Sequence, residues 1–460
     1  MKRLFLPVSI VIANISNFFI IWIASARLGI TEFASFSFWM ATSQLTTVVL
    51  FDWIRTNYIR FSQQDIAKKT NIICLYAAIS FLALATSVPL AIIFSQKIIV
   101  AVLVFAASQG LFDLAQAHAR VEFRNRDFVA LGFIRSIASI LVFFGATHFF
   151  PTANAGILSL AIAFSIGIAY NLIRMAPSAW IFRWSMTTHE VKQIASFGVS
   201  VSLANLLFYA TQAIIRGLAI ASLPGPQTSG GLLALDISQR IFMSIGMAIN
   251  LVTLQPSIRL IQDSHERHFI KSCHVQFCTM FAVIFPIAGI FMLFQKEFTD
   301  LFVNSEYLSG YLLNIYIISF ASAVVAFRSF AIDVGFILNG RGGPVYVGAL
   351  AGFVVTGITY VCIFYYDSRE YCMSVSILAG SLVSVITSLI MLRRIPNWGL
   401  PWLDTAKIAS ASLIFILLAG LPANTPLLYI AFAIVVVSTL YVYLLGFLKV
   451  NAFSYIWPLS

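Results

Sequence analysis

Apolar stretches dominate this chain: about fourteen of them, each of roughly 20 residues, follow one another and are separated by short polar connectors. An α-helix of about 20 apolar residues crosses the hydrocarbon core of a bilayer. The chain has 460 residues, of which 60% are hydrophobic and only 10% are charged, whereas about a quarter of the residues of soluble domains are charged. The sequence therefore predicts an all-α polytopic membrane protein with almost no soluble part.

We expect these spans at residues 7–26, 33–54, 71–94, 98–117, 129–150, 155–173, 194–223, 231–258, 273–294, 308–338, 345–366, 373–392, 406–421 and 426–447. The first of them imitates a signal peptide that ends at Ala24-Ser25-Ala26. Its apolar run exceeds the usual hydrophobic region of a signal peptide, so we expect an uncleaved first span.

Basic residues gather in alternate connectors. If the N-terminus is cytoplasmic, 20 of the 28 basic residues fall on the cytoplasmic side, namely Lys2, Arg3, Arg55, Arg60, Lys68, Lys69, Arg120, Arg124, Arg126, Arg174, Arg183, Lys192, Arg259, Arg267, Lys271, Arg341, Arg393, Arg394, Lys407 and Lys449. The opposite connectors carry acids such as Glu32, Asp300 and Asp367. The positive-inside rule then predicts that both termini are cytoplasmic. The net charge of +11 therefore reflects the basic cytoplasmic connectors and indicates the membrane topology. For this reason we expect no nucleic-acid partner.

The chain repeats its layout around residue 191. The second span ends in Arg60 and the eighth in Arg259, and the connectors at 120–127 and 339–344 occupy equivalent positions in the two halves. Six spans are an even number, so both halves begin on the same side of the membrane, as in parallel repeats. We therefore expect a six-helix bundle over residues 1–190, a second over residues 191–395, and two additional transmembrane helices over residues 396–460.

Charged residues inside the spans are the candidate functional residues, because a charge in the bilayer is costly unless it faces a cavity or a partner. The cations are Arg135, Arg216, Arg240 and Arg328, and the anions are Asp52, Asp113, Asp236 and Asp333. A guanidinium group matches phosphate oxygens, so we expect the four arginines to bind a diphosphate or glycan in a central cleft. Arg216, near the middle of its span, is the first choice for this contact.

Instead of binding a substrate, the same charged side chains have the alternative role of forming ion pairs with one another. Asp236 and Arg240 are four residues apart on one helix face, whereas Arg328 and Asp333 are five apart and less well placed to pair. Arg135 is near enough to its span's end to reach the interface. Asp52, Asp236 and Asp333 are candidates for ion coupling or for such pairing. Further along, Gly348 and Gly352 form a G-x-x-x-G face that predicts close helix packing.

Three segments resemble bacterial flippases for lipid-linked polysaccharides of the O-antigen type, within the multidrug/oligosaccharidyl-lipid/polysaccharide exporter superfamily. Residues 28–36, Leu-Gly-Ile-Thr-Glu-Phe-Ala-Ser-Phe, resemble that family's Leu-Gly-x-x-x-Phe-Gly-x-Tyr turn, with Ala34 and Phe36 as departures. The second point of resemblance is Asp52 together with Arg60 at the end of the second span. The third is the Gly-Gly-Leu sequence at residues 230–232, where the eighth span begins, together with Pro256 at the end of that span. The resemblance implies that the chain moves an undecaprenyl-diphosphate-linked oligosaccharide from the inner to the outer leaflet of a bacterial inner membrane. It also implies a polysaccharide polymerase and chain-length machinery as partners.

Other functions remain open. A cation-coupled drug or toxin extruder of the same superfamily is the runner-up, although the first span, residues 7–26, lacks the acidic residue that such extruders commonly use. An integral-membrane glycan-processing enzyme and a membrane assembly protein are further alternatives. The connectors hold no acid/base or nucleophile constellation, so we expect no catalytic residues and no enzymatic activity. We also expect no cofactor and no metal site.

Overall fold

The computed structural model describes residues 5–61, 75, 78–83, 85, 86, 89, 97–122, 124–174, 188–223, 225–262, 266–338, 342–366, 369–394, 400–415 and 427–448. Every regular element in these ranges is helical, and nine of the helices there are long and apolar enough to cross a membrane. The prediction of an all-α, multi-pass membrane protein is thereby confirmed. The count of fourteen spans stays a prediction, because much of the segments 71–94 and 406–421 lies outside the described residues.

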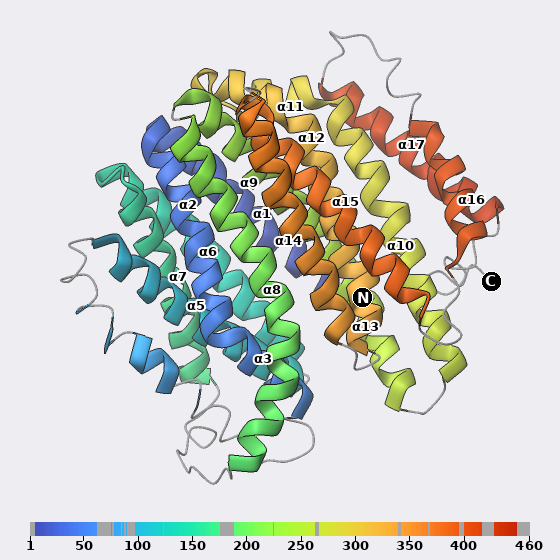
Figure 1. Ribbon diagram of the computed structural model, residues 1–460, viewed down its shortest axis with the longest axis horizontal. Coiled ribbons are helices and arrows are strands. Elements are labelled where there is room, and N and C mark those ends of the chain that lie inside the picture. Colours follow the sequence, from blue (N-terminus) through green and yellow to red (C-terminus); the bar gives the residue numbers. More distant parts are fainter. Residues whose placement is uncertain are drawn as a thin grey trace.

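Two groups of helices lie side by side (Figure 1). The first group is α1 (Phe5–Arg27), α2 (Ile30–Thr47), α3 (Trp53–Phe61), α5 (Lys97–Val121), α6 (Asn125–Phe149) and α7 (Ala153–Arg174). The second is α10 (Glu266–Leu293), α11 (Gln295–Phe302), α12 (Leu308–Phe327), α13 (Asp333–Leu338), α14 (Gly342–Tyr365) and α15 (Cys372–Leu392). Two further helices, α16 (Trp402–Ser412) and α17 (Leu427–Phe447), lie at the outer edge of the second group, where α16 packs on α10.

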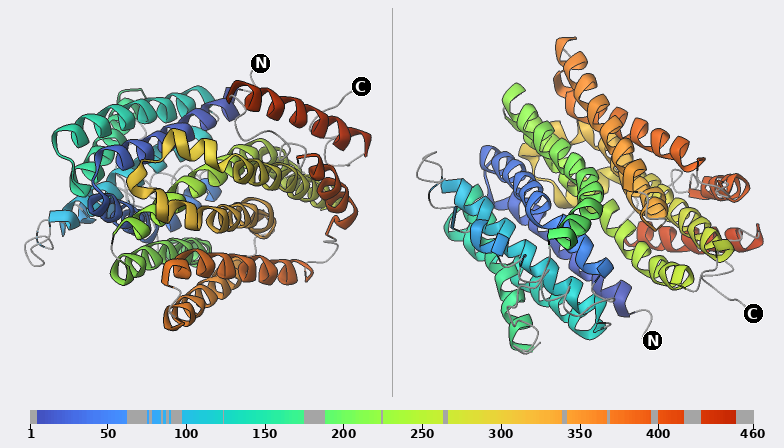
Figure 2. Two further views of the ribbon diagram at one scale, coloured as in Figure 1. Left: turned by 90° about the horizontal axis from the view of Figure 1, so that it is seen from above. Right: turned by 60° about the horizontal axis from the view of Figure 1, so that its bottom comes forward.

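Two long helices connect the groups: α8 (Thr188–Ser222) and α9 (Pro226–Gln262). Helix α8 contacts α2 and α3 on one side and α14 on the other, and Figure 2 shows it between the two groups. Helix α9 packs on α1 of the first group and on α12 of the second. The turn between them contains Gly225 at φ +122°, a conformation that glycine adopts without steric cost, and Pro226 begins α9.

Two of the expected spans are not uniform α-helices. The span at 33–54 contains a π-helical turn, η1 (Val48–Asp52), between α2 and α3, and the span at 308–338 contains another, η4 (Arg328–Ile332), between α12 and α13. A π-turn admits one extra residue per turn and is frequent at functional sites. Hydropathy does not reveal such a turn, because the segment remains apolar throughout.

Glycines set the closest helix contacts. A Cβ atom added at Gly352 would lie 2.9 Å from the carbonyl oxygen of Gly380, so α14 and α15 meet backbone to backbone. The close packing predicted for Gly348 and Gly352 is confirmed. In the same way Gly310 of α12 leaves no room for a side chain beside the backbone of Gln227 in α9.

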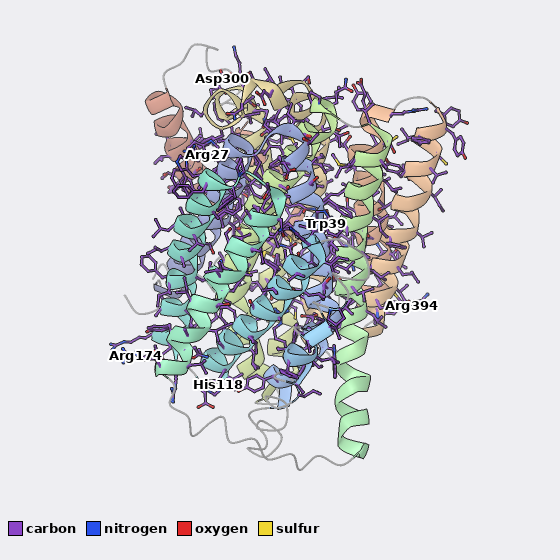
Figure 3. The ribbon with its side chains drawn as sticks, turned by 90° about the vertical axis from the view of Figure 1, so that its left-hand side faces the viewer. Arg27, Trp39, His118, Arg174, Asp300 and Arg394 are labelled. Carbon is purple, nitrogen blue, oxygen red and sulfur yellow. The ribbon has the colours of Figure 1, made fainter. Side chains whose placement is uncertain are left out.

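The connectors expected on opposite sides of the membrane lie at opposite ends of the molecule. Figure 3 shows Arg27 and Asp300 near one end, and Arg174 and His118 near the other. We call the first of these the α1–α2 end, because the turn between α1 and α2 lies there, and the second the far end. The arrangement agrees with the predicted alternation of connectors, in which Arg27 and Arg174 lie on opposite sides.

Candidate functional site: a central cavity between the two helix groups

A cavity of about 340 Å³ lies between the two helix groups. The first group contributes residues from α2, η1, α3 and α5, and the second contributes residues from α12, η4, α13, α14 and α15. Helices α8 and α9 supply the rest of the wall. Its volume falls within the range of small-molecule sites, which are typically about 300–1,000 Å³. Both π-turns face this cavity.

The π-turn η1 holds one ion-pair network at the cavity wall. Asp52 is buried, and its Oδ1 lies 2.5 Å from a guanidinium nitrogen of Arg55. Its Oδ2 accepts hydrogen bonds from Asn205 at 2.7 Å and from Ser202 at 3.3 Å, both on α8. Arg55 also reaches Asp113 of α5 at 3.6 Å, so two carboxylates share one guanidinium.

The π-turn η4 holds a second ion pair. Arg328 and Asp333 lie 3.3 Å apart although they are five residues apart in sequence. The wider π-turn explains this contact, because its i→i+5 repeat brings such residues onto one face of the helix. Arg328 also donates hydrogen bonds to the Ser384 hydroxyl and, at 3.1 Å, to the carbonyl oxygen of Val345.

The charges of the lining do not make the cavity cationic. Three carboxylates, Asp52, Asp113 and Asp333, and two guanidinium groups, Arg55 and Arg328, line it, which leaves one negative charge in excess. The two arginines are both engaged by these carboxylates. The remaining lining includes many aromatic and methionine side chains: Phe51, Phe208, Tyr209, Met243, Met247, Phe330 and Phe353.

Arg216 lies outside the cavity lining, in a buried cluster that joins three helices. One of its terminal nitrogens lies 2.7 Å from Oδ1 of Asp236 on α9, and the other donates to Oε1 of Gln212 at 2.8 Å. Ser37 of α2 donates to Oδ2 of Asp236 at 2.6 Å and accepts a hydrogen bond from Nε of Arg216 at 3.2 Å. Gln212 itself lines the cavity, so this cluster adjoins the cavity and ties α2 to α8 and α9.

At the α1–α2 end, hydrogen bonds join the first group to the second group and to α9. The Tyr307 hydroxyl, just before α12, donates to the carbonyl oxygen of Leu28 at 3.1 Å. Ser229 of α9 donates to the carbonyl oxygen of Ile30 at 3.0 Å. These partners belong to the turn between α1 and α2 that carries the flippase-like motif. The cavity itself begins deeper in the molecule, at Gln44 of α2.

The candidate residues from the sequence thus separate into three places. Arg328, Asp333 and Asp52 line the central cavity, whereas Arg216 and Asp236 form the buried pair beside it. Arg135 and Arg240 lie together in a second, smaller pocket. Asp236 pairs with Arg216 on the neighbouring helix and not with Arg240 four residues along its own helix, because the Arg216 side chain is aimed at it across the α8–α9 contact.

Sequence reasoning missed the polar face of α8. Ser202, Asn205, Tyr209, Gln212 and Arg216 recur every three or four residues, which places them on one face of a helix. This periodicity was a usable signal, since a polar stripe on an apolar span points to a wet or polar surface. The structure turns this face toward the cavity and the Arg216 cluster.

Comparison with known proteins gives matches of structure but not of sequence. No protein-family model and no curated protein sequence matches the chain. Among solved structures, an inward-facing multidrug resistance MATE family transporter of the MOP superfamily aligns with a TM-score of 0.63 at 14% identity, over 89% of this chain and 98% of the other. The MATE multidrug transporter DinF-BH aligns with a TM-score of 0.65 at 13% identity, over 86% and 95%.

A third match is a MOP superfamily transporter from Pyrococcus furiosus, whose binding pocket is described as having reverse polarity that suggests a different function. It aligns with a TM-score of 0.58 at 14% identity, over 85% of this chain and 94% of the other. Identities this low establish the fold alone. The chain is a multi-pass membrane protein with the fold of the MATE transporters of the MOP superfamily.

Proposed function

We propose that this protein exports amphiphilic organic cations by alternating access of the central cavity. The single observation that supports this proposal most strongly is the composition of the lining, which combines aromatic and methionine side chains with one excess negative charge. Aromatic faces attract cations, with energies of about 0.5–2 kcal/mol for each contact. Methionine side chains adapt to ligands of different shape. The drug-extruder alternative is therefore favoured over the flippase that the sequence motifs implied.

The arrangement of the helices supports the transport cycle. Each helix group supplies one wall of the cavity, and one π-turn faces it from each group. At the α1–α2 end, the Tyr307 hydrogen bond joins the second group to the first and the Ser229 hydrogen bond joins α9 to the first group, while the Arg216 cluster ties α2 to α8 and α9 beside the cavity. Rocking of one group against the other would open this end and close the far end, as in transporters built from two repeats.

Uptake into inverted membrane vesicles tests the proposal. Vesicles containing the wild-type chain should accumulate a fluorescent lipophilic cation and should discriminate against an anionic dye of similar size. Phe208→Ala removes a ring from the cavity lining and should lower cation uptake several-fold, because a ring–cation contact of about 1 kcal/mol corresponds to roughly fivefold in affinity. Phe133→Ala is the matched control, since Phe133 is 49% exposed on the outer surface of α6. Preferential uptake of the anionic dye would overturn the charge argument.

A lipid-linked oligosaccharide is the second candidate substrate, because Arg328 offers a guanidinium group at the cavity wall. A diphosphate headgroup would displace Asp333 from Arg328 and form charge-assisted hydrogen bonds in its place. Purified protein in liposomes should then move such a lipid between leaflets and leave it chemically intact. Arg328→Ala should abolish this movement. A lengthened or cleaved glycan as the main product would instead support the enzyme alternative.

A further inference from the structure

Helix α17, at the outer edge of the molecule, buries one of its faces (Figure 1). Val437, Tyr441 and Leu445 recur every four residues and are 7%, 5% and 0% exposed, whereas Tyr443 is 76% exposed. This spacing places the three buried side chains on one face of the helix and Tyr443 on another. On the buried face, the Tyr441 ring packs against the ring of Phe415, with 5.1 Å between the ring centres.

The Tyr441 hydroxyl bonds to the backbone of α10. It donates to the carbonyl oxygen of Ala282 at 2.9 Å. In an uninterrupted α-helix, this carbonyl would accept a hydrogen bond from the backbone N–H of the residue four positions later. That residue is Pro286, which lies inside α10 and has no N–H. The Tyr441 hydroxyl therefore takes the place of the hydrogen bond that Pro286 removes from α10.

The surroundings of this bond make it energetically important. Ala282 is buried, and a buried carbonyl group without a donor is costly, which is why neighbouring helices commonly supply a donor where a proline interrupts a membrane-spanning helix. Ser412 of α16 donates to the Tyr441 hydroxyl oxygen at 3.4 Å, which leaves the hydrogen of Tyr441 for Ala282. These hydrogen bonds connect α16 through α17 to α10.

A second bond from a side chain to the backbone connects α10 to the wall of the central cavity. Gln276 of α10 is buried, and its Nε2 donates to the carbonyl oxygen of Phe330 at 2.6 Å and to Oδ1 of Asn250 on α9 at 2.8 Å. Phe330 belongs to the π-turn η4 and lines the cavity. Helices bend most readily at a proline, so a change of bend at Pro286 would move the half of α10 that carries Gln276 relative to the other half.

We propose that Tyr441 is a positioning residue for the central cavity. Its hydroxyl closes the break at Pro286 and thereby fixes the bend of α10, and α10 in turn holds the π-turn η4 through Gln276. The path leads from the outer edge of the molecule to Phe330 in the cavity wall. Where transport is concerned, this inference rests on the proposed function, whereas the effect of Tyr441 on α10 and η4 is measurable without it.

Thermal unfolding of the purified full-length protein tests the first step. Tyr441→Phe keeps the ring and removes only the hydroxyl, so it should lower the unfolding midpoint by a few degrees, because a buried carbonyl loses its donor. Tyr443→Phe removes an exposed hydroxyl from the same helix and should leave the midpoint unchanged. Pro286→Ala restores the backbone N–H, so Tyr441→Phe should lower the midpoint much less in that background. An equal loss in both backgrounds would overturn the proposal.

Amide hydrogen exchange tests the second step and does not require the Pro286→Ala variant. Tyr441→Phe should speed exchange in peptides that cover α10 and also in peptides that cover η4, because loosening of α10 reaches η4 through Gln276. Tyr443→Phe should leave both segments at the wild-type rate. Faster exchange in α10 alone would show that the effect does not extend to the cavity wall and would overturn the positioning role.

Uptake of the lipophilic cation into inverted vesicles measures the consequence for transport. Tyr441→Phe should raise the half-saturating cation concentration roughly fivefold at a nearly unchanged maximal rate per molecule, because a displaced Phe330 ring binds the cation less well. Gln276→Leu should act in the same way, and the double variant should be no worse than Gln276→Leu alone, since both residues lie on one path. An unchanged half-saturating concentration in Tyr441→Phe would overturn the positioning role. If the wild-type chain takes up no cation, the proposed function fails, whereas exchange at η4 still decides whether Tyr441 holds the cavity wall.

Discussion

Replacement of Asp236 by asparagine should destabilise the protein more than it alters the transport site. Asp236 and Arg216 form a pair whose side chains are 9% and 4% exposed, and the 2.7 Å contact is supported by the Ser37 hydroxyl. Removing one partner of a buried ion pair typically costs about 3–5 kcal/mol, because the other charge is left uncompensated. Gln212 still accepts from Arg216 at 2.8 Å, so we expect the lower end, about 3 kcal/mol.

A double-mutant cycle measures the pair directly. Arg216→Gln alone should also cost about 3 kcal/mol, since it leaves a buried carboxylate. The double variant Arg216→Gln/Asp236→Asn buries two neutral amides and should lose much less than the sum of about 6 kcal/mol, which gives a coupling energy of at least about 2 kcal/mol. Free energies of unfolding would come from denaturant titration in mixed micelles, and abundance in membranes provides a second reading.

Two outcomes would refute this reasoning. One is additivity of the two single variants, which would mean that Arg216 and Asp236 do not stabilise each other. The other is a loss of transport in Arg216→Gln with a free energy of unfolding within about 0.5 kcal/mol of the wild type, a difference typical of surface substitutions. The second outcome would support the original hypothesis from the sequence, in which Arg216 contacts the substrate.

Two further predictions concern packing and topology. Gly310→Ala places a Cβ against the backbone of Gln227 and should destabilise the α9–α12 contact by about 1–3 kcal/mol. Gly357→Ala is the control: its Cβ would have open space around it, so this variant should be neutral or slightly stabilising. Unfolding midpoints of the two variants measure the difference, and equal midpoints would contradict the prediction. Reporter fusions after Lys69 and after Lys449 should both report the cytoplasmic side, and an external signal at Lys449 combined with an internal one at Lys69 would rule out an even number of spans between them.

The glycines and the polar face of α8 show which structural features residue spacing alone predicts. The G-x-x-x-G spacing of Gly348 and Gly352 predicted a close helix contact, and the structure confirms it at Gly380 of α15. The spacing could not name the partner helix, because many helices of similar hydropathy compete for the same face. The stripe from Ser202 to Arg216 was readable in the same way, but only the packing of α8 between the two groups turns it toward a cavity.

The charged residues show most clearly what the sequence does not determine. The sequence by itself determined that the chain is helical and crosses a membrane many times, because backbone polar groups in lipid must be satisfied within each span. It also singled out the buried charges, because each is costly in a bilayer. Only the tertiary structure decided their partners: Arg216 meets Asp236 across two helices, and Arg328 reaches Asp333 through a π-turn. Such contacts depend on ångström-scale positions of neighbouring helices, which hydropathy and residue spacing do not encode.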